Sequence, residues 1–147
     1  MGAQQILMLV IGVIVVGLAV AVGIVMFNSN AYNANRTAIA ADMQGLKIRM
    51  SEFWMLPSSM GGANQNTANL QMENVGNSLG LSNNDGVYSY SGDNGEFRLI
   101  SVDNGEVVIG GLGNVAKHND LFPYIKMTVD MMTQSAELEI KDAAGFE

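Results

Sequence analysis

The dominant pattern in the chain is an uninterrupted run of apolar residues and glycine from Ile6 to Phe27. As an α-helix, these 22 residues extend for about 33 Å, which is enough to cross the hydrocarbon core of a bilayer. A cleavable secretory signal typically has a shorter apolar stretch, about 7–15 residues, preceded by Lys or Arg. Neither condition holds here, so we expect the segment to be retained.

After residue 30 the pattern becomes that of an amphipathic helix. Apolar positions recur at intervals of three and four residues, which places them on one side of a helix. They are Ile39, Met43, Leu46, Met50 and Phe53, with Trp54 beside the last. No proline occurs before Pro57, which is expected to end the helix. We therefore predict one continuous helix over residues 3–55, about 80 Å long.

The rest of the chain predicts a connecting loop and then an antiparallel sheet. Residues 57–86 are rich in Gly, Ser and Asn, with a short helix expected around 67–79. Asp-Asn-Gly occurs at both 93–95 and 103–105, and Asn-Gly is the preferred pair in tight hairpins. The strand-like segments around these turns are 87–91, 96–102, 106–110, 124–130 and 136–141.

These elements predict an α+β fold in which the amphipathic half of a long N-terminal helix packs against a small antiparallel β-sheet head. The chain then divides into an apolar helix (1–29), an amphipathic half-helix (30–56), a connecting loop (57–86) and an antiparallel β domain (87–147). Met50, Phe53 and Trp54 are expected to contribute most from the helix to the core.

In the segment 96–102 the alternation of apolar and polar residues is imperfect. A regular strand would place Phe97, Leu99 and Ser101 on one face, with Arg98, Ile100 and Val102 on the other. We predict no functional role for these residues.

Charge and composition exclude several classes of function. The chain has 7 Lys and Arg against 14 Asp and Glu, a net charge of −7, which argues against a nucleic-acid partner. It has no cysteine, so neither a disulfide nor a thiolate metal site can form. Residues 1–35 carry no charge, whereas residues 57–147 carry 12 acids and 4 bases. The C-terminal part is therefore expected to present a solvated acidic surface.

Little in the sequence indicates catalysis or metal binding. His118 is the only histidine, so it cannot build a zinc site without other ligands, and we interpret it as a surface loop residue. The Asp-Asn-Gly-Glu units at 93–96 and 103–106 lack the ligand spacing of an EF-hand, and hairpin turns account for them. The glycine-rich segment 109–114 lacks the GxGxxG spacing of a phosphate-binding loop. The sequon Asn35–Thr37 falls inside the predicted helix.

We therefore assign no catalytic residue, cofactor or metal ligand, and we expect the protein not to be an enzyme. An enzyme that uses the acidic loops, with calcium, stays open as an alternative. It would require a bound metal or a paired set of carboxylates, neither of which the sequence displays.

The layout of the whole chain resembles a type IV pilin. The segment "QQILMLVIGVIVVGLAVAVGI" has the texture of small and β-branched residues found at pilin N-termini, and the amphipathic half-helix, loop and meander follow in the same order. The resemblance implies a subunit held in the membrane by its apolar half-helix and handled there by a pilus assembly machinery. After assembly, the same half-helix would pack against other copies in the core of an extracellular filament.

The sequence departs from the pilin pattern at three points. Counted from Met1, Gln5 stands where the family usually has a glutamate, and Gln can hydrogen-bond but cannot neutralise a charge. Val22 stands where many members have a helix-kinking proline, and the C-terminal cysteine pair is absent. Subunit docking is therefore expected to depend on apolar fit more than on a salt bridge, in a divergent branch of the family.

Small residues in the apolar segment favour close packing between helices. Gly17 with Ala21 and Ala19 with Gly23 are pairs four residues apart, and Gly12 adds another point of close approach. The alternative is that glycine and alanine are merely tolerated in a single-pass anchor. If packing is correct, a charge at Gly17 or Ala21 should abolish filaments.

Three functions follow from this reading. The first is the major structural subunit of a pilus-like helical filament, a homopolymer on a prokaryotic cell surface that is anchored in the membrane before assembly. The second is a membrane-anchored accessory pseudopilin or binding module that forms no long fibres. The third is the enzyme described above.

Overall fold

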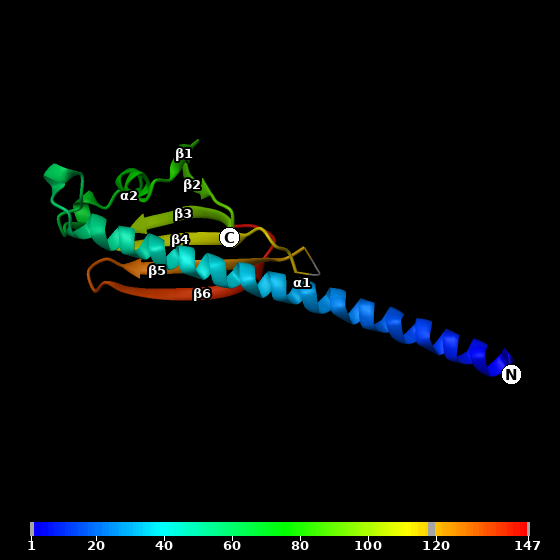
Figure 1. The fold of residues 1–147 in the computed structure, drawn as a ribbon. Helices are drawn as coiled ribbons and strands as arrows, with labels where there is room; N and C mark the ends of the chain where they lie inside the picture. Colours follow the sequence, from blue (N-terminus) through cyan, green and yellow to red (C-terminus); the bar gives the residue numbers. More distant parts are fainter. Residues whose placement is uncertain (1, 118–119, 147) are drawn as a thin grey trace.

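The structure is a computed structural model that describes residues 2–117 and 120–146. A single helix, α1 (Gly2–Met55), runs the length of the molecule, and a six-stranded sheet packs against its C-terminal half only. Figure 1 shows the N-terminal half of α1 extending away from the sheet without covering any of it. The predicted α+β class, with a long apolar N-terminal helix and an antiparallel sheet, is confirmed.

The helix is continuous because nothing within it interrupts the backbone hydrogen bonds. It contains no proline, and the chain has no cis peptide bond among the described residues. Its predicted limits, 3–55, agree with the observed ones to within a residue. Pro57 follows the last turn, as the sequence pattern predicts.

The segment after α1 folds back onto the end of the helix. It contains two short 3₁₀ turns, η1 (Ser58–Met60) and η2 (Thr67–Asn69), and a helix, α2 (Met72–Leu79). The backbone N–H groups of Ala63 and Gln65 donate to the carbonyls of Phe53 and Trp54 at 2.8 and 2.9 Å. The last carbonyls of a helix have no partner within it, so this return of the chain satisfies them and closes the core at that end.

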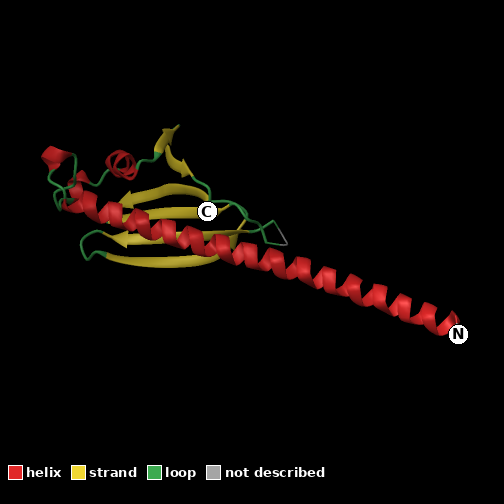
Figure 2. Cartoon of the chain, viewed as in Figure 1, coloured by secondary structure: helices red, strands yellow, loops and turns green. Residues whose placement is uncertain are grey.

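The sheet is a meander in which each strand pairs with the next in antiparallel orientation. Figure 2 shows the strands lying as one layer behind α1, with the first hairpin bent away from the others. The strands are β1 (Ser82–Asn84), β2 (Val87–Ser91), β3 (Gly95–Asp103), β4 (Glu106–Gly113), β5 (Phe122–Asp130) and β6 (Ser135–Ala143).

The sequence pattern missed β1, which lies inside the predicted loop 57–86. Its residues, Ser-Asn-Asn, have low β propensity and are exposed, and they form a strand by pairing with β2. The turn between them is Asp85-Gly86, with φ of 52° and 85°. Positive φ at both central residues is the geometry of a tight hairpin turn, so the turn brings β1 into the sheet.

The two identical Asp-Asn-Gly tripeptides take different conformations. In the second, Asn104 and Gly105 form the two-residue turn between β3 and β4, with φ of 46° and 90°, as predicted. In the first, Gly95 is already a strand residue, and Gly92 N–H donates to its carbonyl at 2.9 Å. The predicted hairpin turn is confirmed, but its two central residues are Asp93 and Asn94 and not the Asn-Gly pair, because cross-strand pairing to β4 places Gly95 within the sheet.

A bulge in β3 corrects the predicted faces of that strand. The register with β4 shifts between Leu99 and Ser101, so Val102 pairs with the buried Val107 and packs against the core. Ser101 pairs with Val108 and lies on the other face. The prediction that Ser101 shares the face of Phe97 and Leu99 is wrong, because the extra residue Ile100 reverses the alternation.

The core lies between α1 and the sheet. From α1 it receives Ile39, Met43 and Met50, each 0% exposed, together with Phe53 and Trp54, and Leu46 packs against it at its margin. The sheet contributes alternate residues of β3, β4 and β5. They are Phe97, Leu99, Val107, Ile109, Ile125, Met127 and Val129.

The glycines of β4 allow α1 to approach the sheet closely. A Cβ on Gly113 would overlap the Asn35 side chain and Pro123, and one on Gly111 would lie 3.0 Å from Ile39. The glycine-rich segment 109–114 is therefore a strand that accommodates a helix.

The opposite face of the sheet is partly covered by the C-terminal segment. Phe146 packs edge-on against the fully buried Tyr124, with 6.1 Å between ring centroids. The Arg98 guanidinium lies 4.4 Å from the centroid of the Phe146 ring. A Cβ on Gly110 would contact both aromatic side chains, so a glycine is needed beneath them.

Candidate functional site

The most unusual surface of the molecule is the N-terminal half of α1. Every described residue from 2 to 30 is exposed, including the large apolar side chains from Ile6 to Phe27. An apolar surface of this extent is not stable in water and indicates contact with lipid or with other proteins. By length and composition, α1 is the one helix of the described residues that could cross a membrane.

The predicted assembly residues all lie on this exposed half. Gln5, Gly12, Gly17, Ala19, Ala21 and Gly23 are all exposed. Figure 1 shows the segment that carries them extending beyond the head, which we define as residues 31–55 of α1 together with the described residues of 57–146. A Cβ placed on Gly12, Gly17 or Gly23 would meet nothing within 4 Å, so these positions form shallow surfaces with room for a neighbour.

The small residues form two strips on different sides of the helix. At about 100° per residue, Gly12, Ala19 and Gly23 fall on one face within about 40°. Gly17 and Ala21 lie about 160° away, on nearly the opposite face. The apolar half therefore offers two separate places where another helix could approach its backbone.

Two buried polar residues fix the point at which α1 leaves the head. Asn35 is 7% exposed, and its side-chain nitrogen donates to the Asn94 carbonyl and to Asn114 Oδ1 at 2.7 and 3.0 Å. Its oxygen accepts from Val115 N–H at 3.3 Å. The sequon asparagine is thus fully engaged within the fold, so its side chain is not available to a glycan.

Tyr32 lies one turn before Asn35 and is 5% exposed. Its hydroxyl donates to Asp142 Oδ1, while Lys117 Nζ donates to Oδ2 of the same carboxylate at 3.1 Å. The Lys117 ammonium also lies 5.6 Å from the centroid of the Tyr32 ring. These contacts tie α1 both to the end of β6 and to the β4–β5 connection.

The same contacts perturb two ionisable groups in opposite directions. Burial, followed by the hydrogen bond to Asp142, raises the pKa of Tyr32 to about 12. The hydrogen bonds from Tyr32 and Lys117 hold the pKa of Asp142 below its usual range. Both shifts favour a neutral tyrosine beside an ionised carboxylate.

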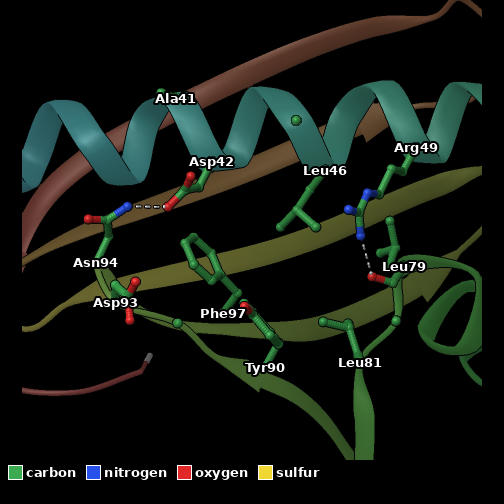
Figure 3. A pocket seen from close by; sticks show the side chains of 13 residues that line it. Ala41, Asp42, Leu46, Arg49, Leu79, Leu81, Tyr90, Asp93, Asn94 and Phe97 are labelled. Carbon is green, nitrogen blue, oxygen red and sulfur yellow. Dashed lines mark hydrogen bonds between the residues drawn. The ribbon is translucent and has the colours of Figure 1, made fainter.

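A first groove, which we call the hairpin groove, lies between α1, the α2–β1 connection and the β2–β3 hairpin and measures about 590 Å³. Figure 3 shows Asn94 donating to Asp42 at one end, at 2.8 Å, and Arg49 donating to the Leu79 carbonyl at the other. Leu46 and Phe97 line it between these ends. These polar contacts join the walls of the groove: the first holds α1 against the β2–β3 hairpin and the second holds it against the end of α2.

A second groove, which we call the junction groove, lies where α1 leaves the head and measures about 970 Å³. It runs between α1 and the end of β6. Its lining consists of Val25, Asn28, Ser29, Tyr32, Asn33, Arg36, Ala116, Lys117, Ile140, Lys141 and Asp142.

The described residues include no group of three or more His, Asp or Glu side chains that could hold a metal ion. Asp103 and Glu106 flank the hairpin turn at Asn104-Gly105, and Asp93 lies in the preceding hairpin. The predicted surface position of His118 lies outside the described residues.

Comparisons with protein-family models, with curated proteins and with solved structures found no match. The long apolar N-terminal helix and the antiparallel sheet are compatible with a pilin-like fold. Functional conclusions therefore depend on the architecture described above.

Proposed function

We propose that the protein is the structural subunit of a pilus-like helical filament that polymerises through the apolar half of α1. The observation that supports this most is the complete exposure of that half beside a folded, acidic head. One molecule cannot cover its own apolar helix, so each copy requires lipid or other copies around it. The proposed location is the membrane before assembly and the cell exterior afterwards, with pilus assembly machinery as a further partner.

The two strips of small residues support a polymer over a closed dimer. A dimer needs one self-complementary patch, whereas contacts on two different faces of one helix can repeat without closing. Burial of apolar area contributes about 25 cal/mol per Å², so uncharged helices can hold copies together without covalent links. The head, on the other half of α1, would lie outside this core and form the solvated surface.

Substitution in one strip tests the proposal. Gly17→Leu keeps the segment apolar, and therefore able to enter a membrane, but fills the place of close helix approach. We expect filament yield in sheared fractions to fall by about tenfold or more, since each 1.4 kcal/mol lost from a contact lowers its association constant tenfold. Gly17→Glu should abolish filaments altogether, because a charge in the core would be unpaired.

Val20→Leu is the matched control, because Val20 lies between the two strips and already carries a large side chain. It should form filaments like the unmodified chain, as seen by electron microscopy, with equal amounts of all variants in the membrane fraction. Normal fibres from Gly17→Leu would contradict the proposal. If the unmodified chain stays in the membrane fraction and never forms fibres, an accessory pseudopilin or anchored binding module is the correct function.

A further inference from the structure

The junction groove concentrates positive charge in an otherwise acidic protein. Two basic side chains line it, Arg36 and Lys117. Lys141 borders it as well, but its ammonium lies 5.5 Å from the centroid of the Tyr124 ring, on the face of the sheet away from α1. Asp142 is the one carboxylate among the lining residues, so the groove carries a net charge of +1 (two cations minus one anion) where the whole chain carries −7. The groove is therefore a local site for an anion.

The carboxylate in this groove is already engaged. Asp142 accepts hydrogen bonds from the Tyr32 hydroxyl and from Lys117. The Arg36 side chain, by contrast, has no hydrogen bond or ion pair to another described residue, and it is exposed. Its charge acts on Asp142, whose pKa is lowered first by the hydrogen bond from Tyr32 and also by Arg36, but its N–H donors stay available to a ligand.

The helix side of the groove continues directly from the apolar half of α1. Val25, Ser29, Asn33 and Arg36 follow one another at spacings of four, four and three residues, which places them on one face of the helix. Along this face the surface changes from apolar to hydroxyl, amide and guanidinium. On the opposite wall, Ile140 and Asp142 lie on the same face of β6, so this wall also changes from apolar to polar.

The position of the groove matches the headgroup layer of a membrane that contains residues 6–27. The apolar half spans about 33 Å, close to the thickness of a hydrocarbon core. Arg36 lies nine residues beyond Phe27, about 13 Å along the axis, and helical side chains tilt towards the N-terminus, which brings its guanidinium back towards the bilayer. Figure 1 shows the β4–β5 connection, which carries Lys117, at the end of the sheet nearest the protruding helix.

We propose that the junction groove binds the phosphate of an anionic phospholipid headgroup while the subunit is anchored in the membrane. Arg36 and Lys117 face the phosphate, Ser29 and Asn33 donate hydrogen bonds to its oxygens, and Val25 and Ile140 contact the start of the acyl chains. This inference depends on the membrane stage of the proposed function and is independent of filament formation. It gives the head a fixed orientation on the bilayer.

Titration of the full chain in maltoside micelles, which contain no phosphate, tests the inference. The probes are short-chain phosphatidylglycerol, phosphatidylcholine with the same chains, and inorganic phosphate, each followed by NMR shifts at Arg36 and Lys117. We expect saturable binding of phosphatidylglycerol, weaker binding of phosphatidylcholine and the weakest for inorganic phosphate. Arg36→Gln should weaken phosphatidylglycerol binding about fivefold, the effect typical of one basic residue near an anionic surface.

Lys126→Gln is the matched control, since it removes one positive charge from the face of the sheet opposite α1, where Lys126 pairs with Glu139. It should leave the affinity unchanged. Equal affinity for inorganic phosphate and phosphatidylglycerol would replace a lipid site by a simple anion site and overturn the inference. Shifts at the groove that appear only on self-association would instead indicate a second copy as its occupant, which also overturns it.

Membrane fractionation separates failure of this inference from failure of the proposed function. A chain that enters phosphatidylcholine vesicles and forms fibres, but shows no preference for phosphatidylglycerol, contradicts only the lipid site. A chain that neither enters vesicles nor forms fibres contradicts the proposed function.

Discussion

At the scale of single residues, Tyr32 and Asn35 decide where α1 separates from the head. Both are polar and buried, and both are satisfied by groups far away in the sequence, at 94, 114, 115 and 142. An unsatisfied buried polar group costs about 1–3 kcal/mol, so each of these contacts holds one helical turn at a defined place on the sheet. The exposed half of α1, residues 2–30, ends just before Tyr32.

We predict that Tyr32→Phe destabilises the head by about 1.5 kcal/mol at neutral pH, since hydrogen bonds to charged groups contribute about 1.5–3 kcal/mol. Fluorescence of the single, buried Trp54 during urea unfolding in detergent micelles measures this. Lys126→Gln, remote from α1, serves as the control and should unfold like the unmodified chain.

The difference in the free energy of unfolding between the unmodified chain and Tyr32→Phe should depend on pH. The pKa of Tyr32 is raised to about 12 from 10, so its contribution is full below pH 10 and is lost as pH rises towards 12. The pKa of Asp142 is lowered from 3.8, so its contribution is present above pH 3.8 and is lost as pH falls below it. A difference that is constant through pH 10–12 would contradict this assignment.

Two glycine substitutions should change stability in opposite directions. Gly113→Ala places a methyl group against Asn35 and Pro123, and we predict a loss of about 1–3 kcal/mol, as for other overpacked sites. At Gly45, an exposed position of α1, an added Cβ meets nothing within 4 Å. Gly45→Ala should therefore stabilise the head by roughly 0.5–1 kcal/mol through helix propensity. The same sign for both substitutions in urea unfolding would contradict the close helix–sheet contact.

At the scale of elements, α1 is one helix with two environments. Residues 2–30 are exposed on all sides, whereas residues 31–55 alternate between buried and exposed positions with a helical period. The sheet shows the same dependence on context. Its two Asp-Asn-Gly segments differ in conformation because of where β4 pairs with β3. β4 begins at Glu106, directly after the segment 103–105, whereas its last residue, Gly113, pairs with Gly95 of the segment 93–95.

We predict that Met43→Ala destabilises the head by about 2–5 kcal/mol, because Met43 is 0% exposed between α1 and the sheet. Ile48 lies on the same helix but is 60% exposed, so Ile48→Ala should change the free energy of unfolding by less than about 0.5 kcal/mol. Thermal unfolding in micelles compares the two. Similar losses at both positions would mean that α1 packs on the sheet through a different face.

At the scale of the whole molecule, the half of α1 that stabilises the fold is separate from the half through which we propose that copies assemble. The head has its own core and satisfies the end of α1 by the return of the chain at 63–65. The apolar half has no contact with that core, so substitutions there should affect association without unfolding the head. This separation is what makes the Gly17→Leu test interpretable.

Charge is also divided along the molecule. The apolar half carries none, the junction groove carries +1, and the acidic residues gather in the head. In the proposed filament, an uncharged core would avoid the penalty of buried charge, and an acidic exterior would keep the assembled copies soluble. The groove lies at the boundary between these regions.

The sequence by itself determined the elements whose patterns are local. The extent of α1, its division into an apolar and an amphipathic half, and five of the six strands follow from hydrophobic periodicity and from proline placement. The positions of Ile39, Met43 and Met50 in the core follow from the same period. Such patterns act between residues a few positions apart, so they can be read along the chain.

Tertiary structure decided the features that require distant partners. The bulge that brings Val102 to the core and the strand position of Gly95 both depend on the neighbouring strand β4. Burial of the sequon residue Asn35, and the approach of Arg36 and Lys117 to one groove, depend on how α1 crosses the sheet. Contacts between residues about 60 to 110 positions apart leave no local pattern, because their energy exists only once the chain has folded.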